Sequence, residues 1–164
     1  MAMENYRAPD ATTIGHVHLK VSDLERSLDF YTKIMGFELT QRYGSSAVFV
    51  SAGGYHHHIG LNTWESLGSA PAPSRAPGLY HLAILYPTRR DLAAALQNLI
   101  DHSVAIDGAS DHGVSQAIYF RDPDQNGIEI YWDRPAEEWP KDAQGNLQMV
   151  SDALNLQELL ELID

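Results

Sequence analysis

The chain repeats one pattern of secondary structure, which leaves few folds open to it. Residues 14–64 predict a strand, a helix and three further strands, because apolar and polar residues alternate in the strand segments and a helical stripe follows the first of them. Residues 79–133 predict the same order again. His16 and His81 occupy equivalent places, each five residues before the end of the first strand of its unit. We therefore expect an internal duplication of two βαβββ modules whose sheets pair.

The expected elements have recognisable starts and ends. We expect strands at residues 14–21, 37–43, 47–52 and 55–62 in the first module, and at residues 79–86, 104–106, 117–120 and 128–132 in the second. Ser22 with Glu25 forms a capping box for a helix of about three to four turns, which Gly36 ends. The second helix starts at Thr88, where Asp91 completes the same capping pattern.

The length of 164 residues is typical of one domain. We expect a single domain at 1–164, with modules at 14–64 and 79–133, a linker at 65–78 rich in Pro, Ala, Ser and Gly, and a C-terminal tail at 134–164. The leucine-rich residues 154–163 predict a short amphipathic helix in this tail. The tail either covers a cleft or a neighbouring subunit, or it docks only loosely.

Composition and charge narrow the functions of the chain. A net charge of -11 argues against binding to nucleic acid or to an anionic membrane surface, because both are bound through Lys and Arg. The absence of cysteine excludes disulfides and thiolate metal sites, so that any metal depends on carboxylates and on the eight histidines. Residues 1–13 lack the apolar core of a signal peptide, and no run reaches transmembrane length, so a cytoplasmic protein is expected.

Residues 111–133 predict an antiparallel hairpin with a carboxylate inside one strand. Two apolar and aromatic runs flank a cluster of Pro, Asp and Asn-Gly, which is typical of a turn. Alternation places Ile128 and Ile130 on one face of the second strand, and Glu129 and Tyr131 on the other. A metal cation would offset the cost of removing Glu129 from water. The alternative is a carboxylate on a solvated strand face.

The same hairpin contains a spacing that imitates a calcium loop. Most of an EF-hand pattern is present at Asp122, Asp124, Asn126, Gly127 and Asp133. An EF-hand loop lies between two helices, whereas strands are expected on both sides here. We therefore interpret these residues as a hairpin turn.

Several motifs of the two modules together resemble those of a known superfamily. The segments H-V-H-L-K-V, H-L-A-I-L-Y and D-P-D-Q-N-G-I-E-I-Y resemble the vicinal oxygen chelate superfamily, over about residues 14–133. Within it, G-G-Y-H-H-H-I-G-L-N-T-W and D-H-G-V-S-Q-A-I-Y-F-R-D-P-D are most similar to extradiol ring-cleaving dioxygenases of the catechol 2,3-dioxygenase type. The resemblance implies an α+β fold in which the two βαβββ modules pair into one cupped mixed β-sheet.

The resemblance also implies a metal site. In the superfamily, the first strand of each module supplies one histidine and the last strand supplies a glutamate, which here correspond to His16, His81 and Glu129. Two histidines and one carboxylate suit non-haem Fe(II), and Mn(II) is an alternative. Apart from the resemblance, a strand histidine such as His81 is more often a buried residue with its hydrogen bonds satisfied.

Three consecutive histidines precede the end of the first module. Successive strand residues face opposite ways, so His56, His57 and His58 cannot all reach one metal. Parity with Ile59 and Leu61 favours an inward His57, and the resemblance gives that residue an acid-base role. A bulge would transfer the role to His56 or His58, and a solvated edge strand is the alternative for all three.

The resemblance gives further roles to Tyr119 and His112, at positions where the family hydrogen-bonds the bound substrate. The alternatives are a core aromatic residue for Tyr119 and a surface loop residue for His112. We expect His18 to contact a metal ligand rather than the metal itself. We expect His102, just past a helix, to be exposed.

The implied activity is cleavage of a catechol, or a substituted catechol, by dioxygen at a non-haem Fe(II) site. The substrate would chelate the metal through both oxygens while dioxygen takes a remaining position, and His57 would move protons. Familiar two-domain extradiol enzymes have four modules, whereas this chain has two and a tail. Single-domain members of the superfamily commonly pair, and an apolar sheet edge or the tail could serve as the contact, so the resemblance implies a homodimer.

Two rival functions use the same fold. A glyoxalase I-type isomerase binds Ni(II) or Zn(II) through four protein ligands, but residues 55–62 contain no acid for the extra position. A bleomycin-resistance-type binding protein needs no metal, and the joint presence of His16, His81 and Glu129 argues against it.

Overall fold

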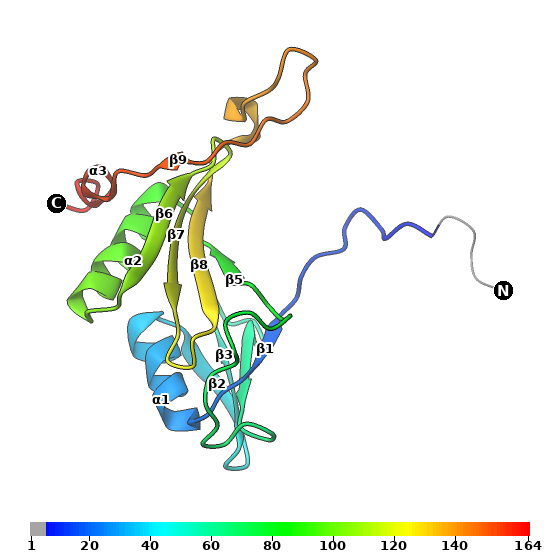
Figure 1. Ribbon diagram of the computed structural model, residues 1–164, viewed down its shortest axis with the longest axis vertical. Coiled ribbons are helices and arrows are strands. Elements are labelled where there is room, and N and C mark those ends of the chain that lie inside the picture. The colour runs from blue at the N-terminus through cyan, green and yellow to red at the C-terminus, as the bar shows by residue number, and fades with distance from the viewer. Residues whose placement is uncertain (1–5) are drawn as a thin grey trace.

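The computed structural model describes residues 6–164 and contains two βαβββ units, each built on its own sheet (Figure 1). The first unit consists of β1 (Val17–Lys20), α1 (Leu24–Asp29), a π-helical turn η1 (Phe30–Ile34), β2 (Glu38–Tyr43), β3 (Ala47–Ser51) and β4 (Ile59–Asn62). The second consists of β5 (Leu82–Leu85), α2 (Arg89–Asp101), β6 (Ile106–Asp111), β7 (Ser115–Arg121) and β8 (Gly127–Asp133). The tail adds η2 (Ala136–Glu138), β9 (Asp152–Ala153) and α3 (Leu156–Leu160).

The two units have the same topology. Their sheets have the orders β1-β4-β3-β2 and β5-β8-β7-β6, and β9 from the tail extends the second sheet beside β6. In each unit the first strand runs parallel to the last one, and the remaining pairs are antiparallel. The prediction of an α+β fold built from duplicated βαβββ modules is therefore confirmed.

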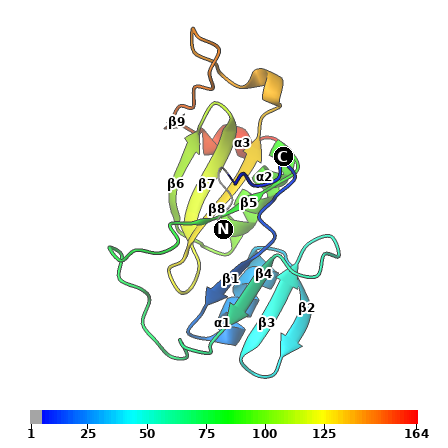
Figure 2. The ribbon, with the colours of Figure 1, turned by 90° about the vertical axis from the view of Figure 1, so that its right-hand side faces the viewer.

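The two sheets remain separate within this chain. In the described part of the chain, β1 pairs only with β4 and β5 pairs only with β8, and no ladder joins the two sheets. Figure 2 shows them as two separate sheets, with β5–β8 in the upper half of the view and β1–β4 in the lower half. The expected joining of both modules into one cupped sheet is thus not made by hydrogen bonds inside a single chain. In the described residues, β1 and β2 are the edge strands of the first sheet, and β5 and β9 are those of the second.

Within one chain the modules meet through their helices and one hairpin. Figure 1 shows α1 and α2 on the same side of the strands, one beneath the other. The Phe30 ring of η1 lies 6.5 Å from the Phe120 ring of β7, centroid to centroid. The Asn98 amide of α2 donates a hydrogen bond of 2.6 Å to the Ile34 carbonyl. Apolar side chains from both modules form one buried cluster at this contact.

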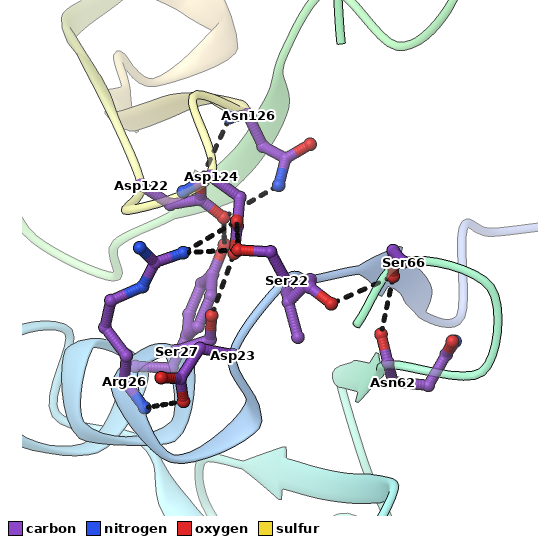
Figure 3. A network of polar contacts seen from close by, with 11 residues as sticks. Ser22, Asp23, Arg26, Ser27, Asn62, Ser66, Asp122, Asp124 and Asn126 are labelled. Atoms are coloured by element: carbon purple, nitrogen blue, oxygen red, sulfur yellow. Dashed lines mark hydrogen bonds and ion pairs between the residues drawn. The ribbon is translucent and has the colours of Figure 1, made fainter. Parts of the chain in front are cut away.

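A polar network fixes the β7–β8 hairpin turn to the start of α1 (Figure 3). The Asp124 carboxylate accepts hydrogen bonds from the Ser22 hydroxyl at 2.5 Å, the Arg26 guanidinium at 2.7 Å and the Ser27 hydroxyl at 3.1 Å. Asp124 is only 8% exposed. The predicted capping role of Ser22 is therefore wrong: its hydroxyl binds the other module, and Asp23 caps α1 by accepting from the Arg26 amide.

The side chain of Asp122 stabilises the β7–β8 turn. The Asp122 carboxylate accepts hydrogen bonds from the backbone amides of Asp124 and Asn126, both at 2.9 Å, and from the Tyr31 hydroxyl at 3.0 Å. The positive φ of 67° at Gln125 belongs to the same tight turn. These bonds account for the spacing that imitates a calcium loop, in agreement with the predicted hairpin.

Several predicted boundaries move in the structure. The strand expected at 55–62 begins only at Ile59, so the three histidines lie in the connection before β4. The short strand expected at 104–106 begins later and is longer in the structure, where it is β6 (Ile106–Asp111). Its ladder with β7 includes the pair of Ala109 and Ile118. The first helix ends in a π-helical turn, after which Gly36 takes a φ of +77°. The second helix begins at its predicted cap, where the Thr88 hydroxyl accepts from the Asp91 amide.

The C-terminal tail is docked on the second module. Strand β9 pairs with β6, and α3 packs against α2 with the Leu159 side chain fully buried. The Arg90 guanidinium donates a hydrogen bond of 2.6 Å to the Leu162 carbonyl. The end of the tail, from β9 to α3, is therefore packed on this module, whereas most of residues 134–151 are exposed. Among the helices of residues 6–164, none combines the length and apolarity that crossing a membrane requires.

Candidate active site

Two of the predicted metal ligands meet in the second module. Strand β5 lies parallel to β8 with Ala83 opposite Glu129, and His81 comes two residues before Ala83 on the same face. The His81 Nε2 atom lies 2.8 Å from the Glu129 Oε2 atom. The Glu129 side chain is 12% exposed, so its charge is largely removed from water. A cationic partner is therefore strongly favoured beside it.

Gly127 makes this approach of β5 to β8 feasible. A Cβ atom at Gly127 would collide with the carbonyl oxygen of Tyr80 and lie 3.2 Å from the His81 Cα. Only glycine leaves room for the backbone that carries His81. The sequence pattern predicts Gly127 only as a turn residue and does not indicate this second role.

Tyr119 lies directly across the ladder from Glu129. The two residues are register partners in the β7–β8 pair, and the Tyr119 hydroxyl is 3.3 Å from the Glu129 Oε1 atom. Burial, followed by the negative charge of Glu129, raises the pKa of Tyr119 to about 12. The hydroxyl therefore stays protonated at neutral pH and can donate to an oxygen acceptor.

His112 extends this chain of polar contacts to the tail. Its Nε2 atom lies 2.7 Å from the Tyr119 hydroxyl, and its Nδ1 atom lies 3.0 Å from the Val150 carbonyl. A carbonyl only accepts, so the contact with Val150 requires a proton on Nδ1. The Tyr119 hydroxyl has a single proton, which it can donate either to the Glu129 Oε1 atom or to the His112 Nε2 atom, but not to both at once. The tail thus sets the tautomer of His112, a contribution that no motif of the sequence indicated.

The other two predicted residues meet in the first module. His16 directly precedes β1, and its ring centroid lies 4.5 Å from that of His57. Partial burial, followed by the neighbouring histidines, lowers the pKa of His57 below its usual value. His56 is exposed, with its Nδ1 atom 2.8 Å from that of His57, whereas the His58 Nδ1 atom lies 2.9 Å from the Ser51 hydroxyl. Of the three consecutive histidines, His57 is the one packed against His16.

The remaining histidines lie away from these pairs of residues. The His18 ring packs 5.4 Å from the Trp64 ring and 5.7 Å from the Phe49 ring, and partial burial lowers its pKa. His102 is exposed, as expected, and its Nδ1 atom lies 2.8 Å from the Asn98 carbonyl.

The candidate site is therefore divided between the modules. Among residues 6–164, no three His, Asp or Glu side chains converge closely enough to hold a metal ion. His81 and Glu129 alone fit part of a site for Fe(II), since an imidazole and a carboxylate are suitable donors. The His81 Nδ1 atom is buried without a hydrogen-bond partner, so this ring has unused bonding capacity. His16, the third predicted donor, lies with the other sheet.

Two hollows adjoin these residues. A groove of about 920 Å³ is lined by both His16 and His81 together with apolar side chains. A smaller hollow of about 220 Å³ is lined by Tyr80, His81, Tyr119 and Phe120, among others. Aromatic side chains and polar groups thus border the same space, as in many sites for small molecules.

Comparison with known proteins identifies the family. The model of a family described as Glyoxalase/Bleomycin resistance protein/Dioxygenase superfamily matches residues 13–130. The chain belongs to this superfamily. The match begins before β1 and ends within β8, so it covers both modules of the superfamily fold and includes His16, His81 and Glu129.

The curated relatives of the chain include a catechol-2,3-dioxygenase and a metapyrocatechase. The chain is 42% identical to a catechol-2,3-dioxygenase of Bacillus subtilis (strain 168) over 151 residues, which are 92% of this chain and 52% of that protein. It is 30% identical to a metapyrocatechase of Geobacillus stearothermophilus over 135 residues, covering 79% of this chain and 38% of that protein. The chain thus spans about half the length of the first of these relatives and less of the second.

A solved structure supports the fold independently. A glyoxalase/dioxygenase from Nostoc punctiforme superposes with a TM-score of 0.66 at 20% sequence identity, covering 82% of this chain and all of that one. At this identity the likeness concerns the fold alone.

Proposed function

We propose that the chain is an extradiol ring-cleaving dioxygenase that acts on catechol, or on a small substituted catechol, at an Fe(II) site. The observation that carries this proposal is the His81–Glu129 pair at 2.8 Å, connected through Tyr119 to His112. The similarity to a catechol-2,3-dioxygenase and a metapyrocatechase supports the same reaction class. The dependence on Fe(II) and the use of dioxygen are parts of the proposal.

Three residues would hold the metal. His81 and Glu129 supply an imidazole and a carboxylate from adjacent strands, and His16 supplies the second imidazole. Fe(II) bound in this way would provide Lewis acidity toward the diol and a coordination position for dioxygen. Mn(II) would satisfy the same donors.

The surrounding residues would orient the diol and move its protons. Tyr119 can donate to an oxygen of the substrate, since its hydroxyl already lies within 3.3 Å of the metal-binding carboxylate. The His112 Nε2 atom, 2.7 Å from the same hydroxyl, is the alternative acceptor for that proton when no substrate oxygen takes it. His57, packed against His16, is the base that would take a proton from a catechol hydroxyl.

The size and lining of the smaller hollow fit a small aromatic substrate. Tyr80 provides an aromatic contact, and His81 and Tyr119 provide the polar ones. On the isomerase alternative, β4 would supply a further acidic ligand, but its sequence is Ile-Gly-Leu-Asn. The buried Asn62 there accepts a hydrogen bond from the Trp64 amide, so its side chain serves the local turn.

An oxygen electrode tests this function. The protein is purified anaerobically, loaded with Fe(II) and given catechol and a panel of substituted catechols. We expect uptake of one dioxygen per ring opened and formation of a yellow semialdehyde. A parallel assay uses the hemithioacetal of methylglyoxal and glutathione. Isomerisation of the hemithioacetal without oxygen uptake on any catechol would contradict the proposal and assign the isomerase reaction instead.

A further inference from the structure

The smaller hollow contains two features that the proposed reaction does not use, an ion pair and a glycine inside a strand. Its lining includes Asp107, Gly108 and Arg121, in addition to His81 and Tyr119. The Arg121 Nε atom lies 2.9 Å from the Asp107 Oδ2 atom, and both side chains are 46% exposed. These three residues therefore border the same space as two residues of the candidate site.

Strand alternation places Arg121 on the same face of β7 as Tyr119. Phe120, between them, is 1% exposed and belongs to the core, so Tyr119 and Arg121 lie on the opposite face. Two residues of a strand span about 7 Å, which is comparable with the length of a single aromatic ring. A catechol whose diol lies beside Tyr119 therefore has the opposite edge of its ring near Arg121.

A β-bulge in β6 positions Asp107 beside this end of the hollow. Ile106 pairs with Phe120 and Gly108 pairs with Tyr119, so Asp107 is the extra residue of the ladder between β6 and β7. Bulges beside functional sites commonly redirect a side chain. The Asp107 carboxylate here accepts a hydrogen bond from Arg121 instead of lying opposite Tyr119.

Gly108 keeps the hollow open opposite Tyr119. A Cβ atom at Gly108 would meet no heavy atom within 4 Å, and the φ of this residue lies outside the left-handed region. Neither a close neighbour nor the backbone conformation therefore requires glycine at this position. Glycine inside a strand weakens the strand and commonly marks a place where a ligand approaches closely. The missing side chain thus leaves space for a substrate.

The ion pair leaves neither of its charges free for a substrate. The Arg121 Nε atom donates to Asp107, and the Nη1 atom donates to the Gln125 carbonyl at 3.2 Å, so two of the three guanidinium nitrogens are engaged. A carboxylate on the ring would meet the like charge of Asp107, and an ammonium group would meet that of Arg121. An uncharged substituent disturbs neither residue.

We propose that the hollow holds the edge of the catechol ring opposite the diol, and that Gly108 and the Asp107–Arg121 pair restrict this edge to small uncharged substituents. The volume of about 220 Å³ is below the roughly 300–1,000 Å³ of pockets for drug-sized ligands, which sets the size limit. The substrate class is then catechol and its alkyl or halogen derivatives. The inference rests on the proposed function, because binding of the diol at the metal orients the ring.

Two variants of the ion pair should change the substrate preference in opposite directions. Asp107→Ala frees the Arg121 guanidinium, and should raise the affinity for 3,4-dihydroxybenzoate relative to 4-methylcatechol by about 10-fold, because a charge-assisted hydrogen bond becomes available. Arg121→Ala should raise the relative affinity for 4-(2-aminoethyl)catechol by a similar factor. Asp29→Ala is the control, since it removes the same charge from an exposed ion pair with Lys33, and it should keep the wild-type ratios.

A third variant tests the role of the glycine. Gly108→Val fills the space opposite Tyr119 with a side chain that suits a strand, and should lower the affinity for 4-methylcatechol relative to catechol by about 10-fold. Gly78→Val is the control, because a Cβ atom at Gly78 also meets nothing within 4 Å but lies outside the hollow. Circular dichroism of both variants checks the fold.

Binding is measured by calorimetric titration of the Fe(II)-loaded protein without dioxygen, so that no ring opens, and turnover is then measured with the oxygen electrode. Wild-type protein that binds 3,4-dihydroxybenzoate as tightly as 4-methylcatechol, or that binds no catechol, would overturn the inference. Wild-type ratios in both ion-pair variants would also overturn it, and ring opening in the same samples would retain the proposed reaction. The expected ratios without ring opening would support the inference while rejecting that reaction.

Discussion

The two modules share one topology, and they differ at a pair of equivalent positions that lies in the candidate site. In the first module, the β1–β4 register sets His18 opposite Gly60, and in the second, the β5–β8 register sets Ala83 opposite Glu129. The His18 ring fills the space above Gly60, because a Cβ atom there would lie 2.9 Å from it. The small Ala83 leaves the equivalent space to the Glu129 carboxylate. Both modules thus have the same fold, but the larger residue of this pair lies on the first strand (β1) in the first module and on the last strand (β8) in the second.

A second difference is the support around each half of the site. The second module has the tail, which adds β9 to its sheet and holds His112 through the Val150 carbonyl. The first module has no equivalent extension in the described residues, and its histidines lie in a connection before β4. The site residues of the second module are therefore held by more contacts. The first module would contribute His16 as a ligand and His57 as a base from a more open surface.

The largest effect is expected at the position that separates the modules. Glu129→Ala should lower the affinity for Fe(II) by at least about 100-fold, because it removes the only carboxylate of the proposed site, and should leave the fold intact. Metal analysis after anaerobic loading, with circular dichroism as the folding check, measures this. Glu65→Ala is the control, since Glu65 is exposed and pairs with Lys20 in the linker region. Full metal content in Glu129→Ala would contradict the proposal that Glu129 of the second module binds the metal.

The next effect concerns the base of the first module. His57→Ala and His57→Gln should reduce catechol turnover by about 10²- to 10⁴-fold while metal content stays at the wild-type level, because general-base catalysis is lost but no ligand is. Turnover and bound metal are measured on the same samples. Loss of both metal and activity would show that His57 is a metal ligand. The chain would then have four protein ligands, as the glyoxalase I-type isomerases do.

The exchange of side chains between the modules predicts a rescue. Gly60→Ala should destabilise the protein by about 1–3 kcal/mol, because its Cβ would press on the His18 ring. His18→Ala in the same chain should recover most of that loss. Urea unfolding measures both, with Gly78→Ala as a control, since nothing lies within 4 Å of a Cβ there. Equal stability of the single and double variants would show that the His18 ring does not determine the need for Gly60.

The smallest effect comes from the network that holds the modules end to end. Burial alone would raise the pKa of Asp124, but hydrogen bonds from Ser22 and Arg26 bring it below its usual value. A carboxyl group with a lowered pKa in the folded state stabilises the fold above the unfolded pKa, and loses that contribution as the pH falls through the folded pKa.

Asp124→Asn should therefore cost about 1–3 kcal/mol at pH 7, and the gap from the wild type should narrow below about pH 4. Unfolding curves at both pH values measure it. Asp29→Asn is the control, since Asp29 is 61% exposed in an ion pair with Lys33. If the difference in unfolding free energy between the wild type and Asp124→Asn does not change with pH, the charge of Asp124 does not contribute to stability.

Much of the fold was predictable from local patterns. The alternation around Glu129, the turn at Asp122 and the cap at Thr88 are all encoded by neighbouring residues, and the structure has them as predicted. The role of Ser22 was not predictable, because its partner Asp124 is far away in the sequence and comes close only when the modules pack. The start of β4 was also missed, since three histidines of similar polarity give no periodic signal.

The candidate site was predictable as a set of residues but not as an arrangement. His81, Glu129, Tyr119 and His112 lie together because strand register follows from the hairpin and the parallel β5–β8 pair. The separation of His16 depends on how whole modules pack, which local patterns do not encode. The contact of His112 with Val150 is likewise long-range and uses a backbone carbonyl, which leaves no trace in side-chain identity.

A crystal structure of the anaerobically Fe(II)-loaded protein, with anomalous scattering at the iron edge, tests the central claim most directly. We predict one iron per chain, bound by His16, His81 and Glu129, with Tyr119 and His57 beside it but not bound. Iron held by His81 and Glu129 without His16, or iron bound to the cluster of histidines before β4, would contradict the account.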